Sequence, residues 1–305
     1  MTLHTPHTPS TPIRCGLGIH ALGLLAAAVL SACGGGDAVK PPADTTAAPA
    51  NTAYVLSSSL LPPTTVMSGG TVRYMIQGFQ DSAAVSKEGT AAAPTFDANR
   101  AVIALDNHAL AATDGTYAVQ EFMGDATFAQ GRWTKGQATI NGVAVSPPLT
   151  GTNSMALHYL VTRDMAAFPA HGTYPCPTYW RNTGLTYTGT TGSSPRDTQL
   201  VGALLPDITI TVGASGAVVF VDTGVQVFAG DSWEVDYEKR TLTFATPSTG
   251  PQYLDGYATE LEGAAFVLGE GTVPNSITLG VAFRRALSGG ARYKGMASVV
   301  CTKSP

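Results

Sequence analysis

The chain has 305 residues, of which 12% are charged, and its formal net charge is −4 at neutral pH. With only 17 lysines and arginines it lacks the cationic surface that grips a phosphate backbone, so nucleic acid is not an expected partner. A coiled coil is excluded as well, because it needs heptads rich in leucine and charged residues. The hydrophobic share of 44% is enough to bury a core, while 34 glycines and 20 prolines indicate many turns.

The first predicted element is a targeting segment. Residues 16–29 form an apolar run that is too short to cross a bilayer as a helix and fits the core of a signal peptide. The run ends in Leu30-Ser31-Ala32-Cys33, which resembles the bacterial lipobox, although His20 interrupts the run. The resemblance implies a lipoprotein signal peptide over residues 1–32, cleavage before Cys33, a diacylglycerol group on its thiol and an acyl chain such as palmitate on its new amine. The alternative is an ordinary secretory signal with a chance cysteine.

The next segment is predicted to be a tether. Residues 33–53 comprise the lipidated cysteine and a disordered stretch rich in Gly, Pro, Thr and Ala. Gly34 follows the cysteine, whereas an aspartate there retains enterobacterial lipoproteins in the inner membrane, so the resemblance favours the outer membrane. Several acyl chains on Cys33 would anchor the protein stably, since one chain binds only marginally. The expected location is the outer membrane, facing the periplasm or the cell surface.

The cysteines lead to a second prediction. Cys15 leaves with the signal peptide and Cys33 is consumed by lipid, so Cys176 and Cys301 remain. A remaining pair in an oxidising compartment is most simply a disulfide, and closing so long a loop contributes about 4 kcal/mol. The alternative, a catalytic thiol at Cys176, is disfavoured because no helix N-terminus stands there to lower the thiol pKa.

The body of the chain shows period-2 alternation interrupted by turn residues, which predicts an all-β fold. The predicted strands span residues 72–77, 101–105, 117–122, 126–133, 137–145, 154–161, 207–212, 217–222, 232–237, 241–246, 257–268, 277–283 and 291–300. Hairpin turns are predicted at residues 213–216, 238–240 and 288–290. Most of these strands are shorter than outer-membrane strands and the aromatic residues form no girdles, so a soluble barrel or sandwich is favoured. We expect an N-terminal β-rich region over residues 54–116 and an antiparallel β-barrel domain over residues 117–305.

The body also carries short glycine and aromatic motifs in two stretches. They are Gly131-Arg132-Trp133, residues 156–161 (ALHYLV) and 168–174 (FPAHGTY), and then residues 263–266 (GAAF), Gly269, residues 280–283 (GVAF) and 293–295 (YKG). These motifs resemble the transferrin-binding-protein-B-like barrel domains of bacterial surface lipoproteins. The chain departs from that pattern at residues 270–279, where the family has a compact turn, and at Val281, which replaces a glycine.

The resemblance implies an eight-stranded antiparallel soluble β-barrel that binds protein partners or solutes through exposed loops. A β-sandwich is the alternative fold. No ligand residue of the family transfers to this chain, because those residues lie in variable loops that the sequence does not match.

The candidate chemical groups are few. After signal cleavage the histidines are His108, His158 and His171, and no hydrolase, Walker or paired-cysteine motif is present. His158 is expected to be a hydrogen-bonded strand histidine and His171 a surface residue, with a zinc site formed by the two and a carboxylate as the alternative. Carboxylate pairs such as Glu260 and Glu262 are interpreted as solvated rather than as a glycosidase pair. A calcium site near Asp231 is disfavoured because ligands on a flat strand diverge.

We therefore predict no catalytic residue, no metal and no cofactor. The favoured hypothesis is a lipid-anchored, non-enzymatic protein that binds an unknown protein or solute ligand. A structural envelope lipoprotein without a soluble ligand is the alternative, and a periplasmic hydrolase is a third possibility.

Overall fold

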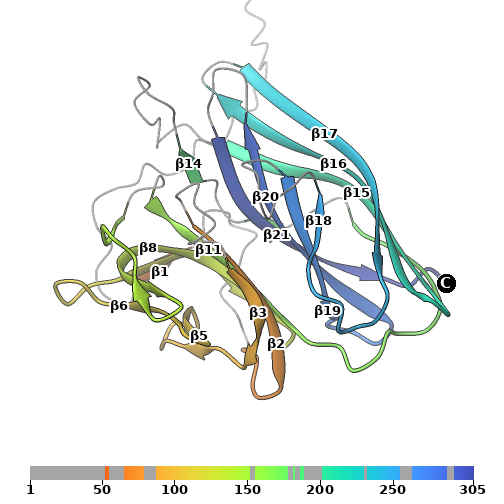
Figure 1. Ribbon diagram of the computed structural model, residues 1–305, viewed down its shortest axis with the longest axis horizontal. Coiled ribbons are helices and arrows are strands. Elements are labelled where there is room, and N and C mark those ends of the chain that lie inside the picture. Colours follow the sequence, from red (N-terminus) through yellow and green to blue (C-terminus); the bar gives the residue numbers. More distant parts are fainter. Residues whose placement is uncertain are drawn as a thin grey trace, which may run out of the picture. The chain divides into compact units, whose positions relative to one another are not determined.

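The computed structural model describes residues 52–54, 65–78, 87–151, 155–177, 181–182, 186–188, 201–229, 232–254, 263–286 and 292–305. Every regular element in these ranges is a β-strand, which confirms the all-β class (Figure 1). No helix in the described ranges has the length and apolar character needed to cross a membrane. The predicted signal peptide, the lipobox and nearly all of the predicted tether lie outside these ranges.

The first of three sheets, the N-terminal sheet, is built around β2, β8 and β11. Its main path runs β3-β2-β11-β8-β6-β5-β4, and β1, β7, β9 and β10 pair beside that path. The strands are β1 (Thr52–Tyr54), β2 (Thr71–Gln77), β3 (Lys87–Ala92), β4 (Thr95–Phe96), β5 (Val102–Leu105), β6 (His108–Ala111), β7 (Ala118–Gly124), β8 (Phe128–Ile140), β9 (Val143–Ala144), β10 (Leu149–Thr150) and β11 (Leu157–Arg163). The predicted domain boundary lies after residue 116. β2 precedes that boundary and β11 follows it, yet the two strands pair in the same sheet.

The strands predicted over residues 126–133 and 137–145 form one long strand, β8, followed by the short β9. The first half of β8 pairs with β7 and β11, and the second half pairs with β6 and β9. Gly136 lies where the partners change and has φ +119°, a conformation that residues with a Cβ rarely adopt. A Cβ there would also lie 2.5 Å from the carbonyl oxygen of Ala111. The glycine therefore allows β8 to serve both parts of the sheet.

The N-terminal sheet has its own core on one face. Trp133 is fully buried there, and its indole N–H donates to the carbonyl oxygen of Val102 at 2.7 Å. The ring of Tyr159 lies beside it, with 5.9 Å between the ring centroids. Buried tryptophan usually needs such an acceptor for its polar end. The Gly-Arg-Trp motif of the sequence thus helps to build a core.

Two further sheets are formed by the C-terminal part of the chain. The outer sheet has the order β12-β15-β16-β17, and the central sheet has the order β13-β21-β20-β19-β18, with β14 also paired to β21. The strands are β12 (Gly172–Pro175), β13 (Arg181–Asn182), β14 (Thr186–Thr188), β15 (Val201–Gly213), β16 (Gly216–Ala229), β17 (Ser232–Phe244), β18 (Gln252–Leu254), β19 (Gly263–Glu270), β20 (Ser276–Ala286) and β21 (Arg292–Thr302). The two sheets share one hydrophobic core, which includes Ile210, Val219 and Phe244 of the outer sheet and Phe266 and Leu279 of the central sheet.

The expected eight-stranded barrel is not found. Among the described strands of residues 117–305, β7 to β11 belong to the N-terminal sheet, and the remaining strands form two sheets that do not close into a barrel. The packing of the outer sheet on the central sheet instead agrees with the β-sandwich alternative.

One predicted turn is confirmed and another is wrong. The hairpin at residues 213–216 joins β15 to β16 as expected. No turn occurs at residues 238–240, because β17 runs through them in unbroken register with β16. The turn predicted at residues 288–290 lies outside the described residues, although β20 and β21 pair up to Ala286 and Arg292 on either side of it.

Six described strands reach the length of outer-membrane strands, and two of these, β20 and β21, have 11 residues each. β8, β15 and β17 have 13 residues each, and β16 has 14 (Figure 1). Most of the other described strands are shorter than outer-membrane strands, as the sequence indicates.

The central sheet is covered on both faces. Seven consecutive residues of β19 are buried, from Gly263 to Gly269, as expected for a strand packed between two layers. One face of the sheet joins the core shared with the outer sheet, and the other face packs against β2 and β11 of the N-terminal sheet. This second contact is formed by Met75, Leu160, Ala265, Val267, Ala282 and Met296.

Candidate functional site: a buried polar layer between two sheets

Beside that apolar contact, polar side chains lie across the N-terminal sheet in one row. His158 of β11 is paired with Gln77 of β2 on one side and with Arg132 of β8 on the other, and Arg132 is paired with Gln120 of β7. Residues in direct cross-strand register share a face of a sheet. The next residue of β11, Tyr159, points to the opposite face and belongs to the N-terminal core. The row therefore faces the central sheet.

The central sheet contributes two cations to the same region. Arg284 of β20 and Lys294 of β21 are cross-strand partners and lie two residues from Ala282 and Met296 of the apolar contact, on the same face. The side-chain amide of Gln77 donates to the carbonyl oxygen of Phe283 at 3.1 Å, which joins the end of β2 to β20. We call Gln77, Gln120, Glu121, Arg132, His158, Arg284 and Lys294 the polar layer. All seven are buried.

The charges of the polar layer are unusual for a protein interior. Its described members carry three cations and one carboxylate. Arg132 donates through Nε and Nη2 to both carboxylate oxygens of Glu121, and Gln120 accepts a weaker contact from Nη2 at 3.4 Å. Burying a charge is costly unless the charge is paired. The bidentate ion pair therefore offsets the cost of burying Arg132 and Glu121.

His158 lies within this layer and is completely buried. Burial lowers its pKa well below the usual value, and the positive charges of Arg132 and Lys294 lower it further. The imidazole is therefore neutral at neutral pH. Its position agrees with the expected strand histidine and not with a solvent-accessible catalytic base.

His108 belongs to a separate hydrogen-bond chain inside the N-terminal sheet. The backbone N–H of Asn141 donates to Nδ1 of His108 at 3.1 Å, so the ring proton is on Nε2 and donates to the hydroxyl of Tyr74 at 3.1 Å. Tyr74 in turn donates to Asp106 at 3.4 Å. Burial lowers the pKa of His108, although Asp106 opposes this effect. These hydrogen bonds fix a neutral tautomer of His108 and join strands β2 and β6 to the turns at Asp106 and Asn141.

The structure does not bring together His158 and His171, the two histidines of the alternative zinc site. His171 is exposed just before β12, whereas His158 is buried. No cluster of three or more His, Cys, Asp or Glu side chains suited to a metal ion occurs in the part of the chain that the structure describes. The predictions for Cys33, Asp231, Glu260 and Glu262 lie outside the described residues.

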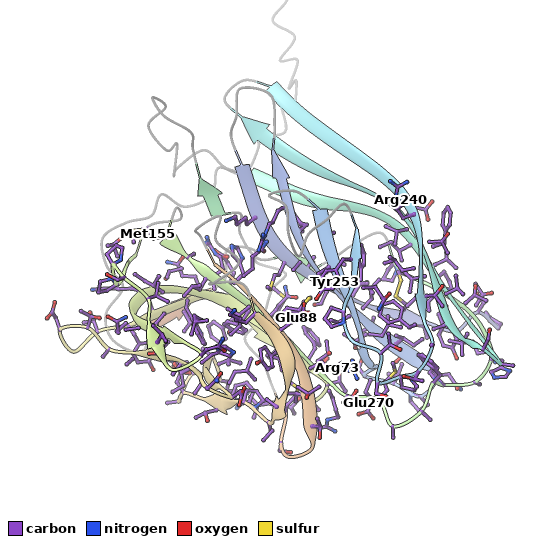
Figure 2. All side chains as sticks on the ribbon, viewed as in Figure 1. Arg73, Glu88, Met155, Arg240, Tyr253 and Glu270 are labelled. Atoms are coloured by element: carbon purple, nitrogen blue, oxygen red, sulfur yellow. A yellow bond between two sulfur atoms is a disulfide. The ribbon has the colours of Figure 1, made fainter. Side chains whose placement is uncertain are left out.

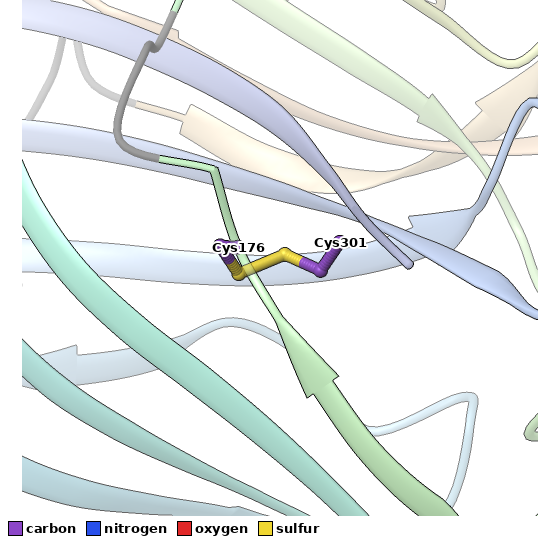
Figure 3. Close-up of a disulfide and its surroundings, with 2 residues drawn as sticks. All are labelled: Cys176 and Cys301. Carbon is purple, nitrogen blue, oxygen red and sulfur yellow. A yellow bond between two sulfur atoms is a disulfide. The ribbon is translucent and has the colours of Figure 1, made fainter. Parts of the chain in front are cut away.

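The predicted disulfide between Cys176 and Cys301 is confirmed (Figure 3). It joins the chain just after β12 to β21, with a sequence separation of 125 residues and 4.2 Å between the Cα atoms. Cys301 is fully buried, and the backbone N–H of Cys176 donates to Ile208 of β15. The bond therefore ties the outer sheet to the central sheet, and the alternative of a catalytic thiol at Cys176 is wrong.

Sequence reasoning missed the polar layer. Gln77, Arg132 and His158 occupy alternate positions on strands whose other face is apolar, and such a pattern normally indicates a solvated face. One signal was present: the continuous apolar run in residues 263–268 is typical of a strand buried on both faces. A strand of that kind requires a second covering layer.

The scan against protein-family models, the search of curated proteins and the search of solved structures each find no match to this chain.

Proposed function

We propose that this protein is a lipid-anchored protein of the bacterial outer membrane, held through Cys33, whose β-sheet body binds a protein or solute partner without catalysing a reaction. The observation that carries the proposal is the motif Leu30-Ser31-Ala32-Cys33 at the end of an apolar run of signal-peptide length. The small residues before the cysteine suit an extended chain in the peptidase, and only a thiol forms the thioether to lipid.

The disulfide supports export of the protein. Disulfides persist in oxidising compartments such as the periplasm and the cell surface, and they are rare in the cytosol. The bond between Cys176 and Cys301 closes a long loop and is partly enclosed by the core of the two C-terminal sheets. It is therefore the kind of bond that stabilises an exported domain.

The described polar side chains support a binding role over a catalytic one. His108 and His158 are both buried, and Arg132 and Glu121, which are buried as well, are paired with each other within the N-terminal sheet. Contact with a partner is therefore assigned to the exposed loops and strand faces.

One exposed strand face is suited to such contact. Val218 and Phe220 of β16 are 38% and 48% exposed. Their cross-strand partners are threonines, Thr209 and Thr211 on β15 and Thr241 and Thr243 on β17. This uncharged surface joins apolar groups to hydroxyl groups, a combination that suits a neutral protein or solute surface.

Metabolic labelling with radioactive palmitate tests the anchor. The wild-type protein and a Cys15→Ala variant are expected to incorporate label, because Cys15 precedes the cleavage site. A Cys33→Ala variant is expected to incorporate none. Equal labelling of Cys33→Ala and the wild type would refute the anchor.

Protease treatment of cells tests the location. If the body faces the exterior, protease added to intact cells should cut it. Cleavage only after permeabilisation of the outer membrane would place the body in the periplasm and refute a cell-surface receptor.

Capture experiments test the binding role. The purified protein is immobilised and exposed to host fluid and to envelope extract, beside a Phe220→Ser variant and a Val143→Ser control, which alters an exposed valine of β9. A partner retained by the wild type and the control but not by Phe220→Ser would support binding at β16. Capture of nothing from either source would favour the structural envelope protein.

A further inference from the structure

We propose that the polar layer is an acid-sensitive latch, in which protonation of His158 releases the N-terminal sheet from the central sheet while the two disulfide-linked C-terminal sheets stay packed together. The proposal concerns the body of the protein alone and does not depend on the lipid anchor or on a binding partner.

The surroundings of His158 make a positive charge unfavourable there. Among the described elements, β8 presents Arg132, β20 presents Arg284 and β21 presents Lys294, while β2 presents the uncharged Gln77. Glu121 of β7 is held by Arg132 through both of its oxygens. A proton on His158 would therefore add a positive charge to a buried layer whose described members already carry three cations and one carboxylate, and Arg132 and Lys294 both oppose it.

The apolar part of the contact depends on close approach of the two sheets. A Cβ on Gly280 would lie 2.6 Å from Cδ2 of Leu160, and a Cβ on Gly269 would lie 2.5 Å from Cβ of Thr162. Small residues thus let β11 lie directly on the central sheet. Dispersion contacts fall steeply when such surfaces move apart, so a repulsion at one end weakens the whole contact.

Few described polar contacts join the N-terminal sheet to the C-terminal part besides the polar layer. Arg73 of β2 donates to the carbonyl oxygen of Thr249, and Tyr253 of β18 donates to Glu88 of β3 (Figure 2). Arg163 of β11 lies 3.8 Å from Glu270 of β19, and both side chains are partly exposed. Arg73 is buried, whereas Tyr253 and the pair of Arg163 and Glu270 are partly exposed, and partly exposed ion pairs contribute little to stability.

Each side of the contact has a hydrophobic core of its own. The N-terminal sheet has the core around Trp133, and the outer and central sheets share the core around Phe266. The disulfide joins the C-terminal sheets to each other and does not reach the N-terminal sheet. Release of the latch therefore opens one contact and leaves both cores closed.

The direction of the pH effect follows from linkage. Burial and the two nearest cations hold the pKa of His158 well below its usual value while the sheets are in contact. After release the imidazole is solvated and binds a proton near its ordinary pKa of about 6.5. The ratio of open to closed protein should thus rise by up to tenfold for each pH unit below about 6.5.

Methionine footprinting with hydroxyl radicals tests the proposal on the full, disulfide-intact protein. Met75 and Met296 lie on opposite sides of the contact, while Met67 lies in the N-terminal core and Met165 in the C-terminal core, and all four are buried. Between pH 7.5 and pH 5, oxidation of Met75 and Met296 is expected to rise as the latch opens. Oxidation of Met67 and Met165 is expected to stay low.

The variants separate the latch from general acid unfolding. His158→Gln cannot take up a proton and is expected to show no rise, whereas His171→Gln, which alters the exposed histidine, should follow the wild type. Lys294→Gln removes one neighbouring cation, which raises the pKa of His158 in the closed protein, so the rise should be smaller than in the wild type. The proposal is overturned if Met75 and Met296 stay protected in the wild type, if all four methionines oxidise together, or if His158→Gln keeps the rise. If His158→Gln does not fold, the test depends on Lys294→Gln. Oxidation of Met75 and Met296 that rises with acid in this variant just as in the wild type overturns the proposal.

Discussion

Arg132 on β8 and Glu121 on β7 form a bidentate ion pair with both side chains buried. Glu121 has a positive φ of 46° and lies where the register between β7 and β8 shifts. The irregularity is a β-bulge, a feature that redirects a side chain relative to its strand. The bulge allows the carboxylate of Glu121 to meet the guanidinium group of Arg132.

This pair should behave as a unit in unfolding experiments. Arg132→Met leaves the carboxylate buried without its partner and is expected to lower the free energy of unfolding by about 3–5 kcal/mol. The double variant Arg132→Met with Glu121→Leu should recover much of that loss, because no charge is then left behind. Urea unfolding of the two single variants and the double variant measures the coupling, and simple additivity would contradict it. As a control, Glu270→Gln removes a partly exposed ion pair and should cost less than about 1 kcal/mol.

The glycines facing β11 should not tolerate a side chain. A Cβ on Gly269 meets Thr162 and lies 3.0 Å from the backbone oxygen of Arg163, which cannot move away freely. Gly269→Ala is expected to lower the free energy of unfolding by about 1–3 kcal/mol. Gly250→Ala is the matched control, because nothing lies within 4 Å of the added atom, and its effect should stay within about 0.5 kcal/mol. Equal stability of the two variants by urea titration would argue against close packing at Gly269.

The disulfide should contribute strongly to stability. Replacement of Cys176 and Cys301 by alanine is expected to lower the free energy of unfolding by about 4 kcal/mol, since the unfolded chain regains the freedom of a long loop. Reduction of the wild-type protein with a thiol should reproduce the loss. Mass spectrometry of alkylated protein measures the bond directly, on protein that has lost residues 1–32 and carries lipid on Cys33. Two alkylated cysteines in the absence of reductant would disprove the bond.

His108 should make the stability fall with acid. Its pKa is lowered in the folded protein, so below about pH 6.5 the unfolded chain binds a proton that the folded chain does not. The contribution is therefore complete above about pH 6.5 and is lost as the pH falls, by at most about 1.4 kcal/mol per pH unit. Urea unfolding between pH 7.5 and pH 5 should show a smaller decline for His108→Gln than for the wild type. The exposed His171→Gln is the control, and an equal decline in all three proteins would count against this role of His108.

Several elements of the fold could be predicted because their causes are local. The alternation in residues 72–77 and 277–283 identified β2 and β20, and the Gly-Ala-Ser-Gly turn identified the hairpin of β15 and β16. The triplet Glu238-Lys239-Arg240 was misleading, because polar residues are also found inside a long strand. In the fold, backbone pairing with residues 221–223 of β16 carries β17 through that triplet.

The polar layer could not be predicted, because its cause is distant in sequence. His158 and its cross-strand neighbours resemble the solvated side of a sheet until a second sheet covers them. The covering sheet comes from residues far along the chain. Gln77, for example, donates a hydrogen bond to Phe283, which lies 206 positions later. No local pattern around either residue specifies the other.

The sequence by itself determined the all-β class and predicted the pairing of Cys176 with Cys301, which the structure contains. Strand periodicity and cysteine number are properties of the chain that need no knowledge of its packing. The tertiary structure alone decided that the sheets stack in place of closing into a barrel, and that the polar face of β2, β8 and β11 is buried. Alternation distinguishes the two faces of a strand, but which surface covers each face depends on contacts between distant segments.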